Sequence, residues 1–234
     1  MQTIWGEGLR PYAIEAKLGA DGSVVREPAP LASGDAKVIA TAAKPFQPTG
    51  GLKVLTGNIG QAIAKTSAVK PERRLVEAPA VVFHSQEEMN AAFKAGELER
   101  DFVAVLRFQG PRANGMPELH KLTTILSVLQ DRGFKVALVT DGRMSGASGK
   151  VPSAIHVTPE ALDGGPIGKI RDGDVIRLDG EAGTLELLVA EAEIKARPRA
   201  VADLSDNGFG MGRELFAAFR TFAGRAEHGA SVFG

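Results

Sequence analysis

The chain has 234 residues, which is enough for one large domain or for one domain with extensions. Hydrophobic residues make up 44% of it and charged residues 24%, a composition typical of a globular protein rather than a disordered one. The 28 Lys and Arg residues equal the 28 Asp and Glu residues, so bulk charge gives no reason to expect a nucleic acid or an anionic membrane as a partner.

No apolar run approaches the roughly 18 residues needed to span a bilayer, and the start, MQTIWGEGLR, lacks a signal-peptide core. We therefore expect a cytoplasmic protein that does not enter a membrane. The sequence also contains no cysteine. Disulfide bonds, thiol catalysis and cysteine-ligated iron–sulfur clusters are consequently excluded for this chain by itself.

Residues 1–50 contain five prolines among short apolar pieces and are expected to form an extended lead-in that packs on the following domain. One or two short strands are expected there, for example at residues 37–40. A further strand is expected at residues 52–55, followed by a turn at Gly57 to Gly60. The polar residues Lys65, Thr66 and Ser67 indicate either a solvated turn or a contact with an anion.

Residues 78–83 have the composition of a strand, and a helix is expected to follow through about Leu98. Ser85 and Glu88 have the spacing of a capping box, which favours a helix that begins directly after Ser85. His84 precedes this helix, and a hydrogen-bonded turn residue is a commoner use for such a histidine than a ligand.

The stretch from Asp101 to Val157 organises the domain. Two strand-like runs, residues 102–108 and 135–140, flank a helical pattern that ends at Gly133. The apolar residues at helical spacing are Leu119, Leu122, Ile125, Leu126 and Leu129. Parallel strands in such a βαβ unit send their following loops, residues 109–117 and 141–149, to the same edge of the sheet, where ligands of α/β proteins bind.

One composite site is therefore expected at this edge. Its candidate residues are Glu118, His120, Asp141, Arg143, Ser145 and Ser148.

After Val157, short alternating strands separated by Gly and Asp turns predict β-hairpins. Asp172 and Asp174 fit a metal site, but an Asp-Gly turn before a strand is the commoner meaning. The tail is expected to form a helix at residues 213–220. The glycines at residues 208–212 before it either seat an anion or only turn the chain.

Three motifs resemble those of the dihydroxy-acid and 6-phosphogluconate dehydratase family. Residues 139–150, VTDGRMSGASGK, resemble its C-terminal signature, and residues 110–119, GPRANGMPEL, resemble a second motif. GNIG at residues 57–60, with KTSAV at residues 65–69, resembles a third. The resemblance runs over nearly the whole chain. The sequence at residues 113–120, 146–150 and 212–217 favours the branch of the family that acts on a phosphorylated sugar acid.

The resemblance implies a mixed α/β fold, a three-layer β/β/α domain of the swivelling type with a barrel-like mixed sheet flanked by helices, over residues 51–234. It implies a hydro-lyase that dehydrates a phosphorylated sugar acid to a 2-keto-3-deoxy acid. The alternatives are another sugar-acid or dihydroxy-acid dehydratase and, in a different class, a non-catalytic module that binds a phosphorylated ligand or a subunit.

Family members bind an iron–sulfur cluster through cysteines in a longer N-terminal region, which this chain lacks. We therefore expect the chain to be the C-terminal domain of a longer enzyme and to be inactive alone. Its expected partners are that N-terminal region, the phosphorylated substrate and, in the full-length enzyme, a second copy in a homodimer.

The resemblance also assigns roles within the composite site. Ser145 would be the general base and Glu118 the one Mg²⁺ ligand from this domain; without the resemblance, a turn serine and a helix-dipole carboxylate would be the better interpretations. His120 would lie behind these groups or on the outer face of its helix. The candidates for contact with substrate or its phosphate are Arg143, Ser148, Lys150, Asp141 and Lys65, with Arg143 alternatively holding its loop through Asp141.

Overall fold

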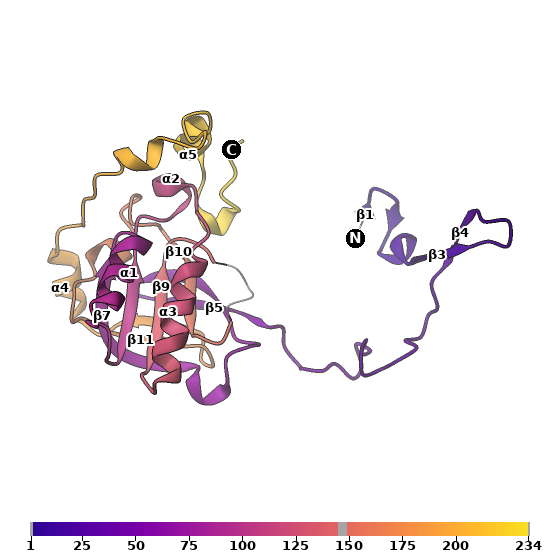
Figure 1. Cartoon of the computed structure of the whole chain (residues 1–234), viewed down its shortest axis with the longest axis horizontal. Helices are drawn as coiled ribbons and strands as arrows, with labels where there is room; N and C mark the ends of the chain where they lie inside the picture. Colours follow the sequence, from indigo (N-terminus) through magenta and orange to yellow (C-terminus); the bar gives the residue numbers. More distant parts are fainter. Residues whose placement is uncertain (1, 145–148, 234) are drawn as a thin grey trace. The chain divides into compact units, whose positions relative to one another are not determined.

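The computed structural model of the chain describes residues 2–144 and 149–233. The chain divides into two compact units, Met1–Thr49 and Gly50–Gly234, which are described separately (Figure 1). Whether the first unit packs on the second, as the sequence predicts, stays a prediction.

The first unit consists of two short antiparallel hairpins, β1 (Gln2–Thr3) with β2 (Gly6–Glu7) and β3 (Ile14–Leu18) with β4 (Val24–Pro28). The strand expected at residues 37–40 is wrong. Asp35 instead makes a turn there, because its main-chain oxygen accepts from the N–H groups of Val38 and Ile39, at 3.1 and 3.0 Å. None of the described residues of this unit is buried.

The second unit is a closed barrel with the strand order β10-β6-β5-β12-β11-β7-β8-β9. Its strands are β5 (Leu52–Gly57), β6 (Gly60–Lys65), β7 (Leu75–Phe83), β8 (Phe102–Leu106), β9 (Val136–Thr140), β10 (Ser153–Thr158), β11 (Val175–Asp179) and β12 (Thr184–Leu187). The helices are α1 (Gln86–Lys94), α2 (Pro111–Asn114), α3 (His120–Asp131), α4 (Glu191–Ala196) and α5 (Ala217–Phe222).

The barrel wall is a mixed sheet. Neighbours from β7 through β8 and β9 to β10 run parallel, as the βαβ pattern predicts. The hairpins β5–β6 and β11–β12 are antiparallel, and a single parallel pair, Thr56 with Thr184, joins them. The expected fold class, a barrel-like mixed sheet flanked by helices, is confirmed.

Side chains alternate between the two faces of the barrel wall, which gives the domain two cores. Val103 and Val105 lie in the inner cluster, whereas Phe102 and Leu106 of the same strand lie in the outer cluster. The outer cluster is covered by the apolar face of α3, through Leu122, Ile125, Leu126 and Leu129, and by Met89 of α1. Burial of each such large side chain stabilises the fold by about 1.5–3 kcal/mol.

Capping residues set the limits of the helices that cover the sheet. The Ser85 hydroxyl accepts from the N–H of Glu88 at 3.1 Å, and the Glu88 carboxylate returns to accept from the N–H of His84 at 2.7 Å. Gly133 follows α3 with φ of 103°, a left-handed conformation that glycine adopts without strain. The helix start directly after Ser85 and the end of α3 at Gly133 are confirmed, whereas α1 ends at Lys94, before the expected Leu98.

The tail helix is shorter than expected. It covers Ala217–Phe222, because residues 211–216 form successive turns, and Gly210, Met211 and Gly212 at their start have positive φ. Within residues 2–144 and 149–233, no helix is long and apolar enough to cross a membrane.

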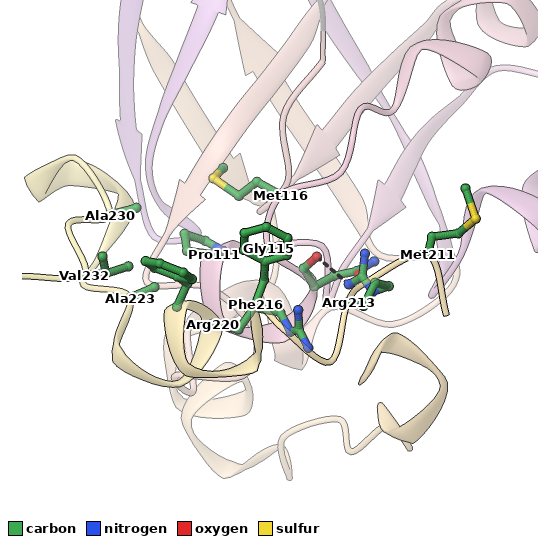
Figure 2. Close-up of a pocket in the computed structure, with 12 residues that line it drawn as sticks. Pro111, Gly115, Met116, Met211, Arg213, Phe216, Arg220, Ala223, Ala230 and Val232 are labelled. Atoms are coloured by element: carbon green, nitrogen blue, oxygen red, sulfur yellow. Dashed lines mark hydrogen bonds between the residues drawn. The ribbon is translucent and has the colours of Figure 1, made fainter. Parts of the chain in front are cut away.

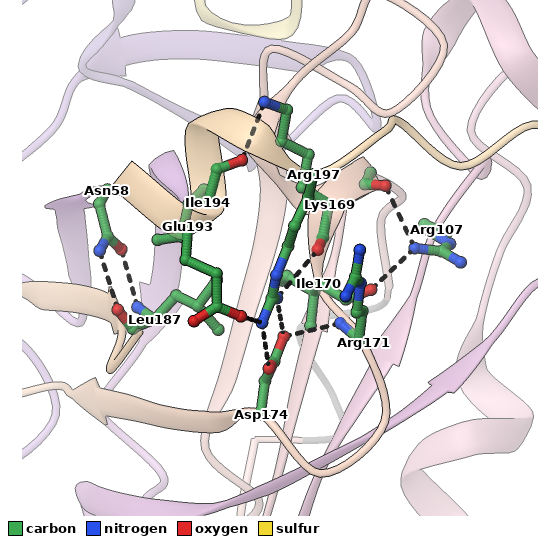
Figure 3. Close-up of polar contacts among 11 residues, drawn as sticks. Asn58, Arg107, Lys169, Ile170, Arg171, Asp174, Leu187, Glu193, Ile194 and Arg197 are labelled. Atoms are coloured by element: carbon green, nitrogen blue, oxygen red, sulfur yellow. Dashed lines mark hydrogen bonds and ion pairs between the residues drawn. The ribbon is translucent and has the colours of Figure 1, made fainter. Parts of the chain in front are cut away.

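Polar side chains hold the loops at one end of the barrel (Figure 3). The Asn58 side chain donates to the Leu187 carbonyl at 2.9 Å and accepts from its N–H at 2.7 Å. The Asp174 carboxylate pairs with the guanidinium of Arg197, and these side chains are only 10% and 6% exposed. The turn interpretation of Asp174 is confirmed, since its N–H donates to the Arg171 carbonyl.

Candidate functional site

The two loops that leave β8 and β9 meet at one edge of the sheet. Glu118 and Arg143 form an isolated parallel bridge, and the Leu119 N–H donates to the Arg143 carbonyl at 3.3 Å. The sequence prediction that these loops form one composite edge is thereby confirmed.

Arg143 joins the loops through its side chain as well. Its Nε donates to the Met116 carbonyl at 2.8 Å, and its Nη1 donates to Glu118 Oε2 at 3.1 Å. The side chains of Arg143 and Glu118 remain 48% and 39% exposed, so both can reach a ligand in solvent. The expected hold of Arg143 on Asp141 is not the one observed, because Arg143 pairs with Glu118 instead.

Asp141 is an internal anchor of this edge. It has no solvent exposure, and its carboxylate accepts from the N–H groups of Phe108, Gln109 and Ala161 at 3.1, 2.9 and 2.9 Å. Burial raises the pKa of Asp141, against the effect of these hydrogen bonds. The structure therefore places Asp141 under the loops, where it fixes their backbone and does not face a ligand.

Gly142 lets the loops approach each other closely. A Cβ atom at Gly142 would lie 2.7 Å from Gln109 Cβ and 2.8 Å from Leu119 Cδ1, so a side chain there would push the two loops apart. Close packing between the loops thus explains why residue 142 of the signature is a glycine.

Glu160 is a buried carboxylate that sequence reasoning missed. Its two oxygens accept from the N–H groups of Arg112 and Ala113 at 2.9 and 3.0 Å, at the start of α2. A Cβ atom at Gly110 would lie 2.3 Å from Glu160 Oε2, so only glycine leaves room for this contact. Burial raises the pKa of Glu160 to about 7. No local sequence motif predicts that Glu160 binds these N–H groups, because its partners lie 47 and 48 residues away.

His156 is a second residue that the sequence prediction missed. It lies in β10 with φ of 55°, and its N–H donates to the Gly142 carbonyl at 2.9 Å. Burial lowers the pKa of His156, and the nearby charge of Arg143 lowers it further. His156 is thus a neutral, half-buried imidazole beside the Arg143 loop.

Two of the predicted cationic residues, Lys65 and Lys150, lie at the end of the signature loop. A Cβ atom at Gly149 would lie 3.5 Å from Lys65 Cδ, which places Lys65 beside the end of the signature. Lys150 pairs with Asp131 at 2.6 Å, at the last residue of α3. Glu118 precedes the first turn of this 12-residue helix, so it lies about 18 Å along the helix axis from Asp131, the partner of Lys150.

The remaining candidates are His120, Ser145 and Ser148, together with His84. His120 is exposed at the first residue of α3, where its carbonyl accepts from the Thr123 hydroxyl at 2.7 Å. Ser145 and Ser148 lie outside the described residues. His84 accepts at Nε2 from Arg107 Nε at 3.0 Å, so the turn-residue interpretation of His84 is confirmed.

A metal ion would find one suitable ligand at this edge. Glu118 offers a partly exposed carboxylate, the hard oxygen donor that Mg²⁺ prefers, and Arg143 would compete with the ion for one of its oxygens. Within the part of the chain that the structure describes, no three His, Cys, Asp or Glu side chains are grouped as metal ligands. Glu118 therefore fits a role as a single ligand in a shared site.

The fold and these loops agree with a comparison against known families. Residues 37–230 match the model of the dihydroxy-acid/6-phosphogluconate dehydratase C-terminal domain, and the chain belongs to this family.

Among individual proteins, the chain is 66% identical over 99% of its length to the phosphogluconate dehydratase of Rhizobium meliloti (strain 1021). It is 58% identical over its whole length to the enzyme of that name from Pseudomonas aeruginosa. A dihydroxy-acid dehydratase from Wolinella succinogenes is 42% identical over 70% of the chain. The chain spans only 38% of the length of the first two relatives.

Proposed function

We propose that this chain is the C-terminal part of a phosphogluconate dehydratase. That enzyme is a hydro-lyase, and it converts 6-phosphogluconate to 2-keto-3-deoxy-6-phosphogluconate in the Entner–Doudoroff pathway. The observation that carries the proposal is the identity of 66% and 58% to two proteins of that name over 99–100% of the chain. The lower identity to a dihydroxy-acid dehydratase, 42% over 70% of the chain, makes a non-phosphorylated 2,3-dihydroxy acid the second candidate substrate.

In this proposal the chain supplies Glu118 as one ligand of Mg²⁺. Mg²⁺ is commonly held by one or two carboxylates, so the other ligands would come from the part of the enzyme that this chain does not span. The same part would supply the cysteines for an iron–sulfur cluster, because this chain has none. When bound, the two metal centres would supply Lewis-acid stabilisation of the leaving hydroxyl and of the charge that develops beside the carboxylate.

A residue of this chain would remove the proton from C2 of the substrate. We assign its removal to Ser145, which lies two residues after Arg143 in the sequence. A serine acts as a base only when positive charge stabilises its alkoxide, and the Arg143 guanidinium is a source of that charge. Arg143 and Ser148 stay our candidates for substrate contacts, together with Lys65 and Lys150 at the end of the signature, whereas the buried Asp141 supports the loop.

The rest of the enzyme is the proposed partner of the first unit. Residues 1–36 lie outside the C-terminal family match, yet the relatives align over nearly the whole chain. Ile4, Trp5 and Leu18 are 91%, 57% and 78% exposed, which is typical of apolar side chains that another surface covers. A homodimer of the complete enzyme remains a prediction.

The function is tested with a hybrid enzyme in which this chain replaces the matched 38% of the Rhizobium meliloti protein. After anaerobic loading with iron, sulfide and Mg²⁺, kcat/KM is measured for 6-phosphogluconate, gluconate and 2,3-dihydroxyisovalerate. We expect the highest value for 6-phosphogluconate and no turnover by this chain alone. Preference for either of the other acids would contradict the proposal, and turnover by the cysteine-free chain alone would contradict the role given to the cluster.

A further inference from the structure

The C-terminal tail forms a pocket against the loop that carries Glu118. The pocket has a volume of about 420 Å³ and lies between α2, its following residues Gly115 and Met116, and the tail from Met211 to Val232. Figure 2 shows Met116, Phe216, Arg213 and Arg220 gathered around it. Among the described residues, two arginines and no acidic residue line this pocket, so its lining favours an anion even though Glu214 interacts with Arg220 from nearby.

Arg213 fastens the tail to the loop. Its Nη2 donates to the carbonyl and to Oδ1 of Asn114, at 3.0 and 2.6 Å, and its Nε donates to the Asn207 carbonyl at 2.5 Å. The Asn114 amide in turn donates to Gln109 Oε1 at 2.8 Å. Arg213 is thus committed to holding the tail in place.

Arg220 is differently situated. It is half-buried, and within residues 2–144 and 149–233 its guanidinium makes no hydrogen bond or ion pair, although its charge helps to lower the pKa of the Glu214 carboxyl. The stem of Arg220 lies against Gly115, where an added Cβ atom would be 3.5 Å from Cγ and from Cδ. The walls beside it include the rings of Phe216 and Phe219, and apolar walls strengthen the attraction between a guanidinium and an anion.

Met116 connects the pocket to the composite edge. Met116 lines the pocket, and its carbonyl accepts from Arg143, the residue that pairs with Glu118. Gly115 and Glu118 are three positions apart in the sequence, so their Cα atoms lie within about 11 Å of each other. A small molecule held at Glu118 by one end would therefore extend toward the pocket with its other end.

We propose that Arg220 binds the phosphate of the substrate and that Arg213 positions the tail that carries it. This inference deepens the proposed function, on which it rests, by naming the residue that distinguishes a phosphorylated sugar acid from an unphosphorylated one. A guanidinium is suited to this task because its planar N–H groups bind phosphate oxygens in pairs.

The first test uses the hybrid enzyme with 6-phosphogluconate and with gluconate. We expect Arg220→Gln to lower kcat/KM for 6-phosphogluconate about ten- to hundredfold, and to leave kcat/KM for gluconate unchanged. Arg220→Lys should restore part of the loss, since it keeps the charge. The control is Arg100→Gln, an exposed arginine that precedes β8 and so lies at the opposite edge of the sheet. An equal loss for both substrates, or no loss for 6-phosphogluconate, would overturn the assignment.

The second test does not depend on turnover. Inorganic phosphate is titrated into this chain, and the guanidinium N–H signals are followed by nuclear magnetic resonance. We expect saturable shifts in the native chain and in Arg100→Gln but none in Arg220→Gln. An absence of shifts in the native chain, or identical shifts in Arg220→Gln, would overturn the subsite. A hybrid enzyme that is inactive on 6-phosphogluconate, together with phosphate binding that depends on Arg220, would contradict the proposed function and leave the subsite standing.

Discussion

Arg143 donates to Glu118 Oε2 at 3.1 Å, and this ion pair ties together the two loops that leave the neighbouring parallel strands β8 and β9. The carboxylate of Glu118 and the backbone of the signature loop are thereby fixed relative to each other. Beneath them, the Asp141 carboxylate binds three backbone N–H groups, and nearby Glu160 binds two more. The exposed edge is thus supported by buried carboxylates.

Replacement of Asp141 by asparagine should destabilise the domain. A side-chain amide has one accepting oxygen and would turn its NH₂ group toward N–H donors, so at least one buried N–H loses its partner. We expect the free energy of unfolding at neutral pH to fall by about 1–3 kcal/mol. Chemical denaturation of Asp141→Asn measures it, with Asp131→Asn as the control because Asp131 is an exposed partner of Lys150. Equal stability of the two variants would contradict the anchoring role.

Glu160 should make the stability of the chain depend on pH. Its pKa is raised from 4.5 to about 7 in the folded state, so the folded state prefers the protonated form. The stabilisation is complete below pH 4.5 and is lost as the pH rises through 7, by about 3 kcal/mol in all.

The measurement is the free energy of unfolding of the native chain and of Glu160→Gln between pH 4.5 and 8. We expect a smaller decline in the variant than in the native chain. Glu99→Gln, which removes an exposed partner of Arg132, should retain the native profile. A Glu160→Gln profile that parallels the native one would refute this assignment.

The Asp174–Arg197 pair should stabilise the barrel end. Burial raises the pKa of Asp174, but the guanidinium of Arg197 outweighs this effect and leaves it below its usual range. Removal of Asp174 leaves the buried Arg197 guanidinium with the exposed carboxylate of Glu193 as its ion-pair partner, so we expect Asp174→Ala to cost about 3 kcal/mol of unfolding free energy. Its melting temperature is compared with that of Glu191→Ala, which breaks only an exposed pair with Lys195. Similar melting temperatures would show that the buried pair is unimportant.

The parallel strands and their common edge could be predicted from the sequence because the pattern that defines them is local. Residues 102–106 and 136–140 are apolar runs, and Leu122, Leu126 and Leu129 repeat at helical spacing between them. The capping box at Ser85 and Glu88 is equally local. Each of these signals lies within a short segment of the sequence. Packing in the barrel then stabilises the strand or helix that the signal predicts.

The parts that could not be predicted depend on contacts between distant residues. Glu160 reaches α2 across 47 and 48 residues, and Asn58 reaches Leu187 across 129. An aspartate in a loop is usually exposed and able to bind a ligand, and only the fold shows that Asp141 is buried. The pocket around Arg220 likewise forms only when the tail folds back on α2.

We propose that Glu118 is a metal ligand in the active site of the complete enzyme. The most direct test is kcat of the loaded hybrid enzyme with 6-phosphogluconate as a function of Mg²⁺ concentration, for native Glu118 and for Glu118→Gln. Glu118 is partly exposed, so the variant should keep the native melting temperature. We predict a loss of kcat of about a hundredfold or more, or a comparable rise in the Mg²⁺ concentration required. Native kcat with an unchanged Mg²⁺ requirement in Glu118→Gln would contradict the account.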